Sequence, residues 1–187
     1  MIAVVEPPAP VVTWNDMAPQ LSLELDDVRR PLVEAYIAAA TSHIDGPTGW
    51  LQRAIGVQTL ELRFEAVRRQ CVALPCPPVI NVVGVSYLDR DGVLQEAPVD
   101  GVELIDSALH PINSSWPWET ASVRRDAVRV RYRAGYETVP PSIKVAIMMM
   151  ATDLVRNRGT VAVGLSATSV PMSTTVEALL NPFQVFR

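Results

Sequence analysis

Residues 128–156 read VRVRYRAGYETVPPSIKVAIMMMATDLVR, and the hydrophobic period of this stretch changes half-way along it. Its first seven residues alternate between apolar residues and arginine, which is typical of a strand with one buried and one solvent-facing face. After the two prolines, apolar residues recur every three or four positions, which indicates one face of a helix. A half-buried strand that leads into an amphipathic helix predicts an α+β fold. The strand places Val128, Val130 and Tyr132 on one face and Arg129, Arg131 and Arg133 on the other.

The helix of this stretch is predicted over residues 140–159. Two prolines open it, Ser142 caps it or lies in its first turn, and Gly159 ends it. Only part of the run Met148–Met150 can face the core of the same chain. We expect either that all three methionines pack in that core or that one of them meets a partner. The predicted apolar stripe consists of Ile143, Ala146, Ile147, Met150, Ala151 and Leu154.

The N-terminal part of the chain is predicted to be helical after an extended arm. Residues 1–12 form the arm, because three of them are prolines that exclude a helix or a central strand. Residues 13–56 are predicted to be mainly helical. Thr13 is the expected N-cap of a short first helix, and a long helix is expected over Asp26–Ile44, followed by a helical turn near Trp50–Ile55.

Residues 57–135 are predicted to be mainly β. A tight turn at Asp89–Gly92, between two apolar stretches, predicts a β-hairpin. By contrast, Ser107–Ser122 lacks a clear period and is predicted to be a loop. Residues 160–187 are predicted to form a loop and a C-terminal docking segment. The expected strands are Val57–Phe64, Cys71–Leu74, Val79–Leu88, Val102–Ile105 and Ala127–Ala134.

The composition is that of a globular chain. Hydrophobic residues make up 49% and charged residues 19% of its 187 positions, which is enough apolar surface for one core. We therefore predict a single domain over residues 1–187, a small helical bundle with an inserted antiparallel β region and extended N- and C-terminal arms. The formal net charge of −4 argues against tight, phosphate-driven binding of DNA. No apolar stretch approaches the ~20 residues of a membrane span, so we expect no membrane partner.

No constellation typical of catalysis occurs in the sequence. His43 and His110 have no nearby partner of the kind that a catalytic triad or a metal site requires. Cys71 and Cys76 have the wrong spacing for a zinc site and lack a second pair. The acidic pair in Asp89–Asp91 suits a turn, and the later ligands of a calcium loop are missing. We predict that the protein is not an enzyme and needs no cofactor or metal.

Five segments of the sequence carry a resemblance to a known family. They are Pro8-x-x-Val11-Val-Thr13, the acidic approach to a helix that ends in Thr48-Gly49, Leu74-Pro-x-Pro-Pro-Val79 running into Val82–Gly92, Val128-x-Val-x-Tyr132-x-Ala-Gly-Tyr136 with Val139-Pro-Pro-Ser-Ile143 opening a helix that ends at Arg156-Asn-Arg158, and Val176-Glu-Ala-Leu-Leu180 through Arg187. In this order, they resemble the head–tail connector (adaptor, or head-completion) proteins of long-tailed phages and the related adaptors of gene transfer agents. The sequence departs from the family pattern at Trp14–Pro19 and in the Trp116/Trp118 loop.

The resemblance implies a small α+β subunit of a homo-oligomeric ring, a dodecamer in this family, that lies beneath the portal. Such a ring extends the DNA channel, joins capsid to tail, and lets DNA pass without sequence-specific binding. The implied partners are further copies of the chain, the portal protein and a tail-proximal neck or stopper protein. The implied location is the neck of a virion or phage-like particle, assembled in the cytoplasm of the bacterial host.

The same analogy assigns candidate contact residues. Two alternatives stay open beside it: another neck or tail-completion protein of the same kind of particle and, less favoured, a small soluble enzyme or binding domain. The candidate portal contacts are Val176, Leu179, Leu180, Phe183, Val185, Phe186 and Arg187. The candidate contacts to a neighbour or to the tail side are Asp89, Arg90, Asp91, Gly92, Trp116 and Trp118.

Overall fold

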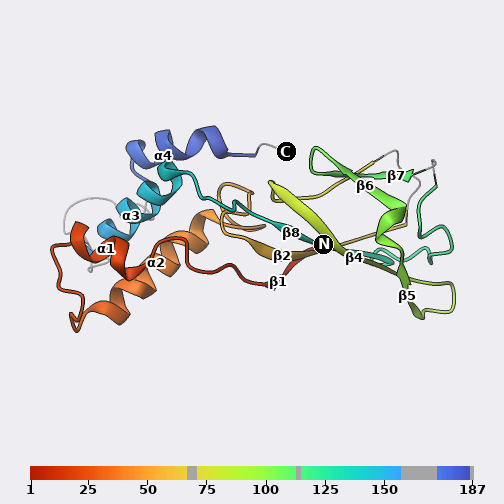
Figure 1. Cartoon of the computed structure of the whole chain (residues 1–187), viewed down its shortest axis with the longest axis horizontal. Helices are drawn as coiled ribbons and strands as arrows, with labels where there is room; N and C mark the ends of the chain where they lie inside the picture. The colour runs from red at the N-terminus through yellow and green to blue at the C-terminus, as the bar shows by residue number, and fades with distance from the viewer. Residues whose placement is uncertain (67–70, 113–114, 157–171, 186–187) are drawn as a thin grey trace, which may run out of the picture. The chain divides into compact units, whose positions relative to one another are not determined.

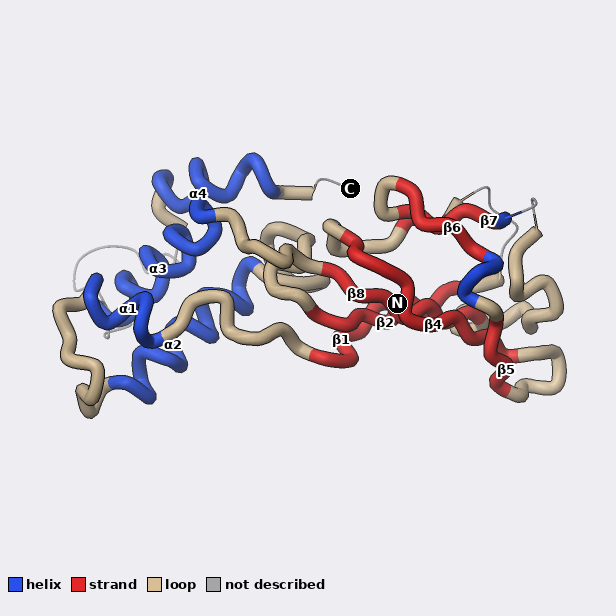
Figure 2. Tube along the Cα trace, viewed as in Figure 1, coloured by secondary structure: helices blue, strands red, loops and turns tan. Residues whose placement is uncertain are grey.

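The computed structural model describes the whole chain except residues 67–70, 113–114, 157–171 and 186–187. The chain divides into two compact units, each built from two separate stretches of sequence. The β unit comprises Met1–Ala9 and Arg53–Glu137, and the helical unit comprises Pro10–Gln52 and Thr138–Arg187. Figures 1 and 2 show the strands of the first and the helices of the second. The α+β prediction is confirmed, and the β region is inserted between the two halves of the helical unit.

The main element of the β unit is a five-stranded antiparallel sheet. Its strand order is β1-β2-β8-β4-β5, so the arginine-rich strand β8 lies at its centre. A second, three-stranded sheet has the order β3-β7-β6, and a short 3₁₀ turn, η1, leads into β6. The bounds are β1 Ile2–Glu6, β2 Gln58–Phe64, β3 Val72–Ala73, β4 Val79–Leu88, β5 Leu94–Ala97, η1 Val99–Gly101, β6 Val102–Ile105, β7 Ala108–Pro111 and β8 Val128–Ala134.

Strand β8 has one buried face and one solvent-facing face, as its alternation predicts. Val128, Val130 and Tyr132 are fully buried, whereas the arginines between them point away from the core. The Tyr132 hydroxyl donates a hydrogen bond of 2.8 Å to the carbonyl oxygen of Pro75, so the phenol remains satisfied inside the core. Strand β8 pairs with β2 on one side and with β4 on the other. Its apolar face therefore lies in the middle of the core of the β unit.

The residues predicted to form an N-terminal arm, 1–12, do not form a free arm, because part of this segment is a paired strand. Residues Ile2–Glu6 form β1, which pairs antiparallel with β2 at the edge of the main sheet. The prolines at positions 7, 8 and 10 fall just after this strand and end it. A strand at a sheet edge has one row of backbone groups without a sheet partner, and Val4 and Val5 on β1 remain more than 40% exposed.

The prediction of a loop over Ser107–Ser122 is wrong for its first residues. Ala108–Pro111 forms β7, which pairs with β6 in a hairpin. The two residues between these strands, Asp106 and Ser107, both adopt the left-handed conformation, with φ of 47° and 63°. This backbone belongs to a tight hairpin turn. The sequence Asp-Ser is a weak signal for such a turn, because Asn-Gly and Asp-Gly are the usual ones.

The helical unit contains four helices and a terminal 3₁₀ turn in the described part of the chain. The long helices α2 and α3 pack against each other, and α4 packs against α3. The apolar stripe predicted for α3 lies in this core, where Ile143, Ala146, Ile147 and Ala151 are fully buried. The bounds are α1 Trp14–Gln20, α2 Arg30–Ile44, α3 Pro141–Arg156, α4 Thr174–Leu180 and η3 Asn181–Phe183. None of the helices in the described ranges is long and apolar enough to cross a membrane.

One helix start agrees with expectation, one differs, and one predicted helical turn is absent. Helix α1 starts after Thr13, whose hydroxyl donates a hydrogen bond of 2.7 Å to Asp16, as the capping pattern predicts. Helix α2 begins at Arg30, four residues later than predicted. The Arg29 guanidinium and backbone N–H donate to the carboxylate of Asp27, which closes a local turn and holds the pKa of Asp27 at about 2. The helical turn predicted at Trp50–Ile55 is absent, since the described backbone there is irregular.

Candidate interaction surfaces

The C-terminal segment is anchored on its own helical unit. Helix α4 is capped by Ser173, whose Oγ accepts a hydrogen bond from the Val176 backbone N–H at 3.3 Å. Beyond η3, the Val185 backbone N–H donates to the Leu51 carbonyl oxygen at 3.1 Å. The described part of the segment is therefore a packed element, not a free arm.

The candidate portal contacts on this segment divide into two groups. Val176 is 1% exposed and Leu180 is fully buried, so both fill the core of the helical unit and do not form a contact surface in this conformation. Leu179, Phe183 and Val185 are half-buried and present part of their side chains to solvent. Phe186 and Arg187 lie outside the described residues. The hypothesis of a partner contact is narrowed to the half-buried side chains and the terminal pair.

The candidate contact residues in the hairpin turn between β4 and β5 also fall into two groups. One Asp89 carboxylate oxygen accepts backbone hydrogen bonds from Asp91 at 3.0 Å and from Val93 at 2.9 Å, and the other accepts one from the Gln95 side chain at 2.8 Å. The hydrogen bond from Gln95, together with the backbone hydrogen bonds, lowers the pKa of Asp89. Asp89 therefore shapes the turn, while Arg90 and Asp91 are exposed at its tip and Gly92 supplies a φ of 81°.

The two tryptophans of the long loop are core residues. Trp116 is 7% and Trp118 is 2% exposed, and their rings stack with centroids 4.5 Å apart. Phe64 of β2 meets Trp118 edge-on with centroids 5.8 Å apart. The expectation that these side chains form a surface contact is replaced by a packing role, because aromatic pairs of this geometry stabilise a core. The aperiodic sequence around them gave no signal of this burial.

A buried carboxylate on the outer face of the main sheet was missed by sequence reasoning. Glu61 of β2 is 3% exposed and lies between two arginines. Arg131 of β8 donates to one of its oxygens at 2.6 Å, and Arg63 of β2 donates to the other at 2.7 Å. Burial raises the pKa of Glu61, but the hydrogen bonds from Arg131 and Arg63 outweigh this effect, so the pKa lies below its ordinary value. Only the register of β2 against β8 brings Glu61 opposite Arg131.

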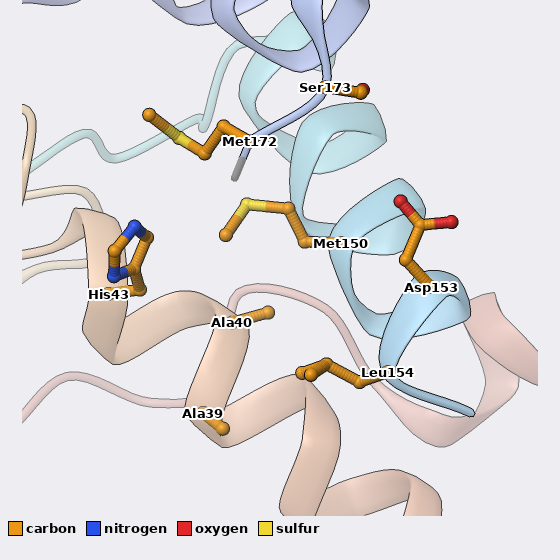
Figure 3. A pocket seen from close by; sticks show the side chains of 8 residues that line it. All are labelled: Ala39, Ala40, His43, Met150, Asp153, Leu154, Met172 and Ser173. Carbon is orange, nitrogen blue, oxygen red and sulfur yellow. The ribbon is translucent and has the colours of Figure 1, made fainter. Parts of the chain in front are cut away.

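An apolar groove runs between α2 and α3 in the helical unit, with a volume of about 200 Å³. Figure 3 shows Met150 in its middle, Ala39 and Ala40 on α2, and Met172 near the start of α4. Met150 is half-buried, as are Met148 and Met149, so none of the three is fully enclosed in the core of the helical unit. His43 and Asp153 lie at its two sides, and among the described residues no hydrogen bond joins them. The groove is therefore an apolar surface without a paired acid and base.

Metal chemistry finds no support in the described residues. No group of three or more His, Cys, Asp or Glu side chains in that part of the chain is arranged to hold an ion. Cys71 is exposed and Cys76 is buried, and neither forms a disulfide.

The comparisons with known proteins bear on the whole chain. No protein-family model matches the sequence, and no curated protein matches it. Among the solved structures that match, three do so over 100% of this chain and 96% of their own chains. Two are chains in the neck of a gene transfer agent (GTA) particle: one in an empty particle computed with C6 symmetry, with a TM-score of 0.76 and 20% identity, and one in a native particle computed with C12 symmetry, with a TM-score of 0.72 and 18% identity. The third is a chain in the virion of a native GTA particle, with a TM-score of 0.76 and 19% identity.

The chain has the fold of these GTA particle chains. The likeness covers both units from end to end, so it includes the insertion of the β unit into the helical unit. At about 20% identity it is a likeness of fold, and it assigns no contact residue.

Proposed function

We propose that this chain is a structural subunit of a head–tail connector (adaptor) ring in the neck of a gene transfer agent or phage particle. The ring would lie beneath the portal, extend the DNA channel and join capsid to tail. The observation that carries the proposal is the end-to-end likeness to chains of GTA particles, two of them described as neck structures. The resemblance of the five sequence segments to the same family supports it independently of the fold.

We infer a homo-oligomer, a dodecamer in the simplest form. The related neck structures were computed with C6 and C12 symmetry, which agrees with a ring of twelve copies. Rings are closed by heterologous contacts, so each copy would use two different patches for its two neighbours. With a formal charge of −4 per copy, the assembled ring would be strongly acidic, and DNA would pass without being held.

The proposed portal contact is the C-terminal segment, through Leu179, Phe183 and Val185 and through the terminal Phe186 and Arg187. Half-buried apolar side chains on an anchored segment suit docking, because burying the rest of each side chain adds apolar contact at little ordering cost. The proposed neighbour or tail-side contact is the tip of the β4–β5 hairpin at Arg90–Gly92, facing a stopper-type neck protein.

A mixing experiment tests the proposal. The purified chain and its cognate portal protein are combined, and complex formation is followed by size-exclusion chromatography with light scattering and by negative-stain electron microscopy. We expect a portal complex crowned by a ring of this chain. Failure of the chain to associate with the portal under any salt condition contradicts the connector role.

A truncation addresses the contact itself. Removal of residues 181–187 is expected to leave a folded chain that no longer docks on the portal. The variant Ala178→Ser on α4 is the matched control, since it keeps the tail and alters an exposed residue that is not among the proposed contacts. Docking of the truncated chain with wild-type affinity would exclude this segment as the portal contact.

The second candidate function is a different structural position in the same neck, such as a tail-completion protein. It rests on the same fold likeness. Association with a tail protein in place of the portal would favour it. Either role is structural, and the groove between α2 and α3, which lacks a paired acid and base in its described lining, gives no support to an enzyme.

A further inference from the structure

Two oppositely charged surfaces lie on the β unit, and each carries charged side chains that form no ion pair among the described residues. The first is the outward face of β2 and β8, which we call the arginine face. It carries four arginines against one buried carboxylate, Glu61. Arg63 and Arg131 share Glu61, whereas neither Arg129 nor Arg133 has an ion-pair partner among the described residues. The arginine face consists of Arg63, Arg129, Arg131 and Arg133.

The arginine face is also partly apolar. The pairing of β4 with β8 shifts between Val82 and Gly84, which places Val83 in a bulge beside Arg131. Val83 is 51% exposed. At the edges of the face, Glu6 on β1 already accepts a hydrogen bond of 2.7 Å from Thr59, and Glu96 on β5 lies in register with Ser86 and Arg129. Strands β2 and β8 therefore present cations, and β4 adds one exposed apolar side chain beside them.

The second surface follows η1 and β6, and we call it the acidic edge. Asp100, Glu103 and Asp106 are all exposed, and none has an ion-pair partner in the described part of the chain. Strand β6 is the last strand of its sheet, so its outer backbone groups have no sheet partner. Two apolar side chains accompany the carboxylates, Val99 at 38% and Ile105 at 44% exposure. Residues 89–106 hold six acidic residues and one arginine, a formal −5 in a chain of −4.

We propose that the arginine face of one copy binds the acidic edge of the next copy in the ring. This inference rests on the proposed ring function and assigns its subunit contact. The occupant is a second copy because one unit carries both halves of a complementary pair, and a heterologous ring needs two different patches on each subunit. Cations and carboxylates, each beside an exposed apolar side chain, set the register of such a contact and speed association.

Charge reversal in pairs gives the test. The variants are Arg133→Glu on the arginine face, Asp100→Lys/Glu103→Lys on the acidic edge, and all three changes combined. Arg133 is exposed and its side chain forms no ion pair among the described residues, so its replacement is expected to leave the sheet intact. Ring assembly is measured by mass photometry and sedimentation, for the chain alone and with the cognate portal, at low and high salt.

Each one-sided variant is expected to weaken assembly by about tenfold or more, and the combined variant is expected to regain most of the loss. Rising salt should weaken wild-type assembly, since these charges are exposed. Lys144→Glu on α3 is the matched control, with the same charge change on the helical unit, and is expected to assemble like the wild type. Circular dichroism and melting curves establish that each variant is folded, and Arg133→Ala replaces Arg133→Glu if the latter is not.

Several results would overturn the inference while leaving the proposed function in place. The first is assembly of Arg133→Glu, or of Arg133→Ala in its place, at the wild-type level. The second is a combined variant as defective as the one-sided variants. The third is an Arg133→Glu variant that assembles normally but no longer binds a short random-sequence DNA duplex, as measured by fluorescence anisotropy. This result would make the arginine face a DNA contact. Failure of the wild type itself to assemble, alone and with the portal, would instead contradict the ring function.

Discussion

Glu61 of β2 and Arg131 of β8 stand opposite each other in the main sheet, and Arg131 Nε donates a hydrogen bond of 2.6 Å to the Glu61 carboxylate. Arg63 supplies a second hydrogen bond from the same strand as Glu61. The carboxylate is buried, whereas the side chains of Arg63 and Arg131 are 38% and 58% exposed. The two cations thus reach solvent while the anion between them does not. The fold is therefore expected to lose less stability when the anion is removed than when both cations are removed.

Replacing this carboxylate is the first test. Glu61→Gln is expected to lower the free energy of unfolding by about 1 to 2 kcal/mol, because it keeps the shape and removes two charge-assisted hydrogen bonds. Arg63→Met/Arg131→Met is expected to cost about 3 kcal/mol, because it leaves a buried carboxylate without a counter-charge. Urea unfolding followed by circular dichroism gives both values. Equal costs for the two variants would contradict this account.

Acid should remove the contribution of Glu61. Its pKa in the folded chain lies below the ordinary value of 4.5, so the unfolded chain takes up the proton first as pH falls. The stabilisation is complete above pH 4.5 and is lost as pH falls through the folded pKa. The difference in melting temperature between wild type and Glu61→Gln is therefore expected to be constant at neutral pH and to shrink below about pH 4.5. Melting curves across this range measure it, and a difference that grows in acid would contradict the sign.

The hairpin turn depends on Asp89. Asp89→Ala removes the acceptor of three hydrogen bonds and is expected to loosen the turn, with faster hydrogen exchange at the backbone amides of Asp91 and Val93. Asp91→Ala is the control, because the Asp91 side chain is exposed at the same tip. Exchange is followed by mass spectrometry on peptides that cover the hairpin. Equal exchange in both variants would remove the structural role of the Asp89 carboxylate.

Local sequence patterns predicted those helices and strands that are determined by residues close together in the sequence. The alternation of Val128–Ala134, the stripe of α3 and the Thr13–Asp16 cap follow from period and capping alone, and the structure has all three. The strands Val79–Leu88 and Val102–Ile105 have the predicted bounds. In each case the side chains that are buried or hydrogen-bonded lie within one strand or one helix.

Long-range contacts decided what the sequence did not predict. The arm became β1 through pairing with β2, some 55 residues away in sequence, and no local signal reports such pairing. The burial of Trp116 and Trp118 depends on their stacking and on Phe64, so the lack of a period in this segment predicts only a loop. Among the candidate site residues, Val176 and Leu180 are candidate portal contacts only through the resemblance to the connector family. Only the packing of α4 on α3 shows that they face inward.

The two units are expected to unfold together. The chain passes between them three times, after Ala9, Gln52 and Glu137, so neither unit is a continuous segment that can separate from the other. This supports our proposal of a single cooperative domain. Differential scanning calorimetry should give one transition, with equal calorimetric and van't Hoff enthalpies. Two resolved transitions would show that the units are independent domains.

Variants of two neighbouring leucines on α4, Leu179 and Leu180, can distinguish an effect on folding from an effect on docking. Leu180 is fully buried in the helical unit, so Leu180→Ala leaves a cavity and is expected to cost about 3 kcal/mol of stability, a drop of roughly 6 to 12 °C in Tm. Leu179 is half-buried, so Leu179→Ala is expected to cost less than half as much. If the proposed portal contact is correct, the order reverses for docking. Leu179→Ala weakens portal binding at a temperature where the chain is folded, whereas Leu180→Ala at the same temperature binds in proportion to its folded fraction. Melting curves and portal pull-downs with the two variants measure both effects, and a Leu179→Ala chain that is folded and binds normally would place the portal contact elsewhere.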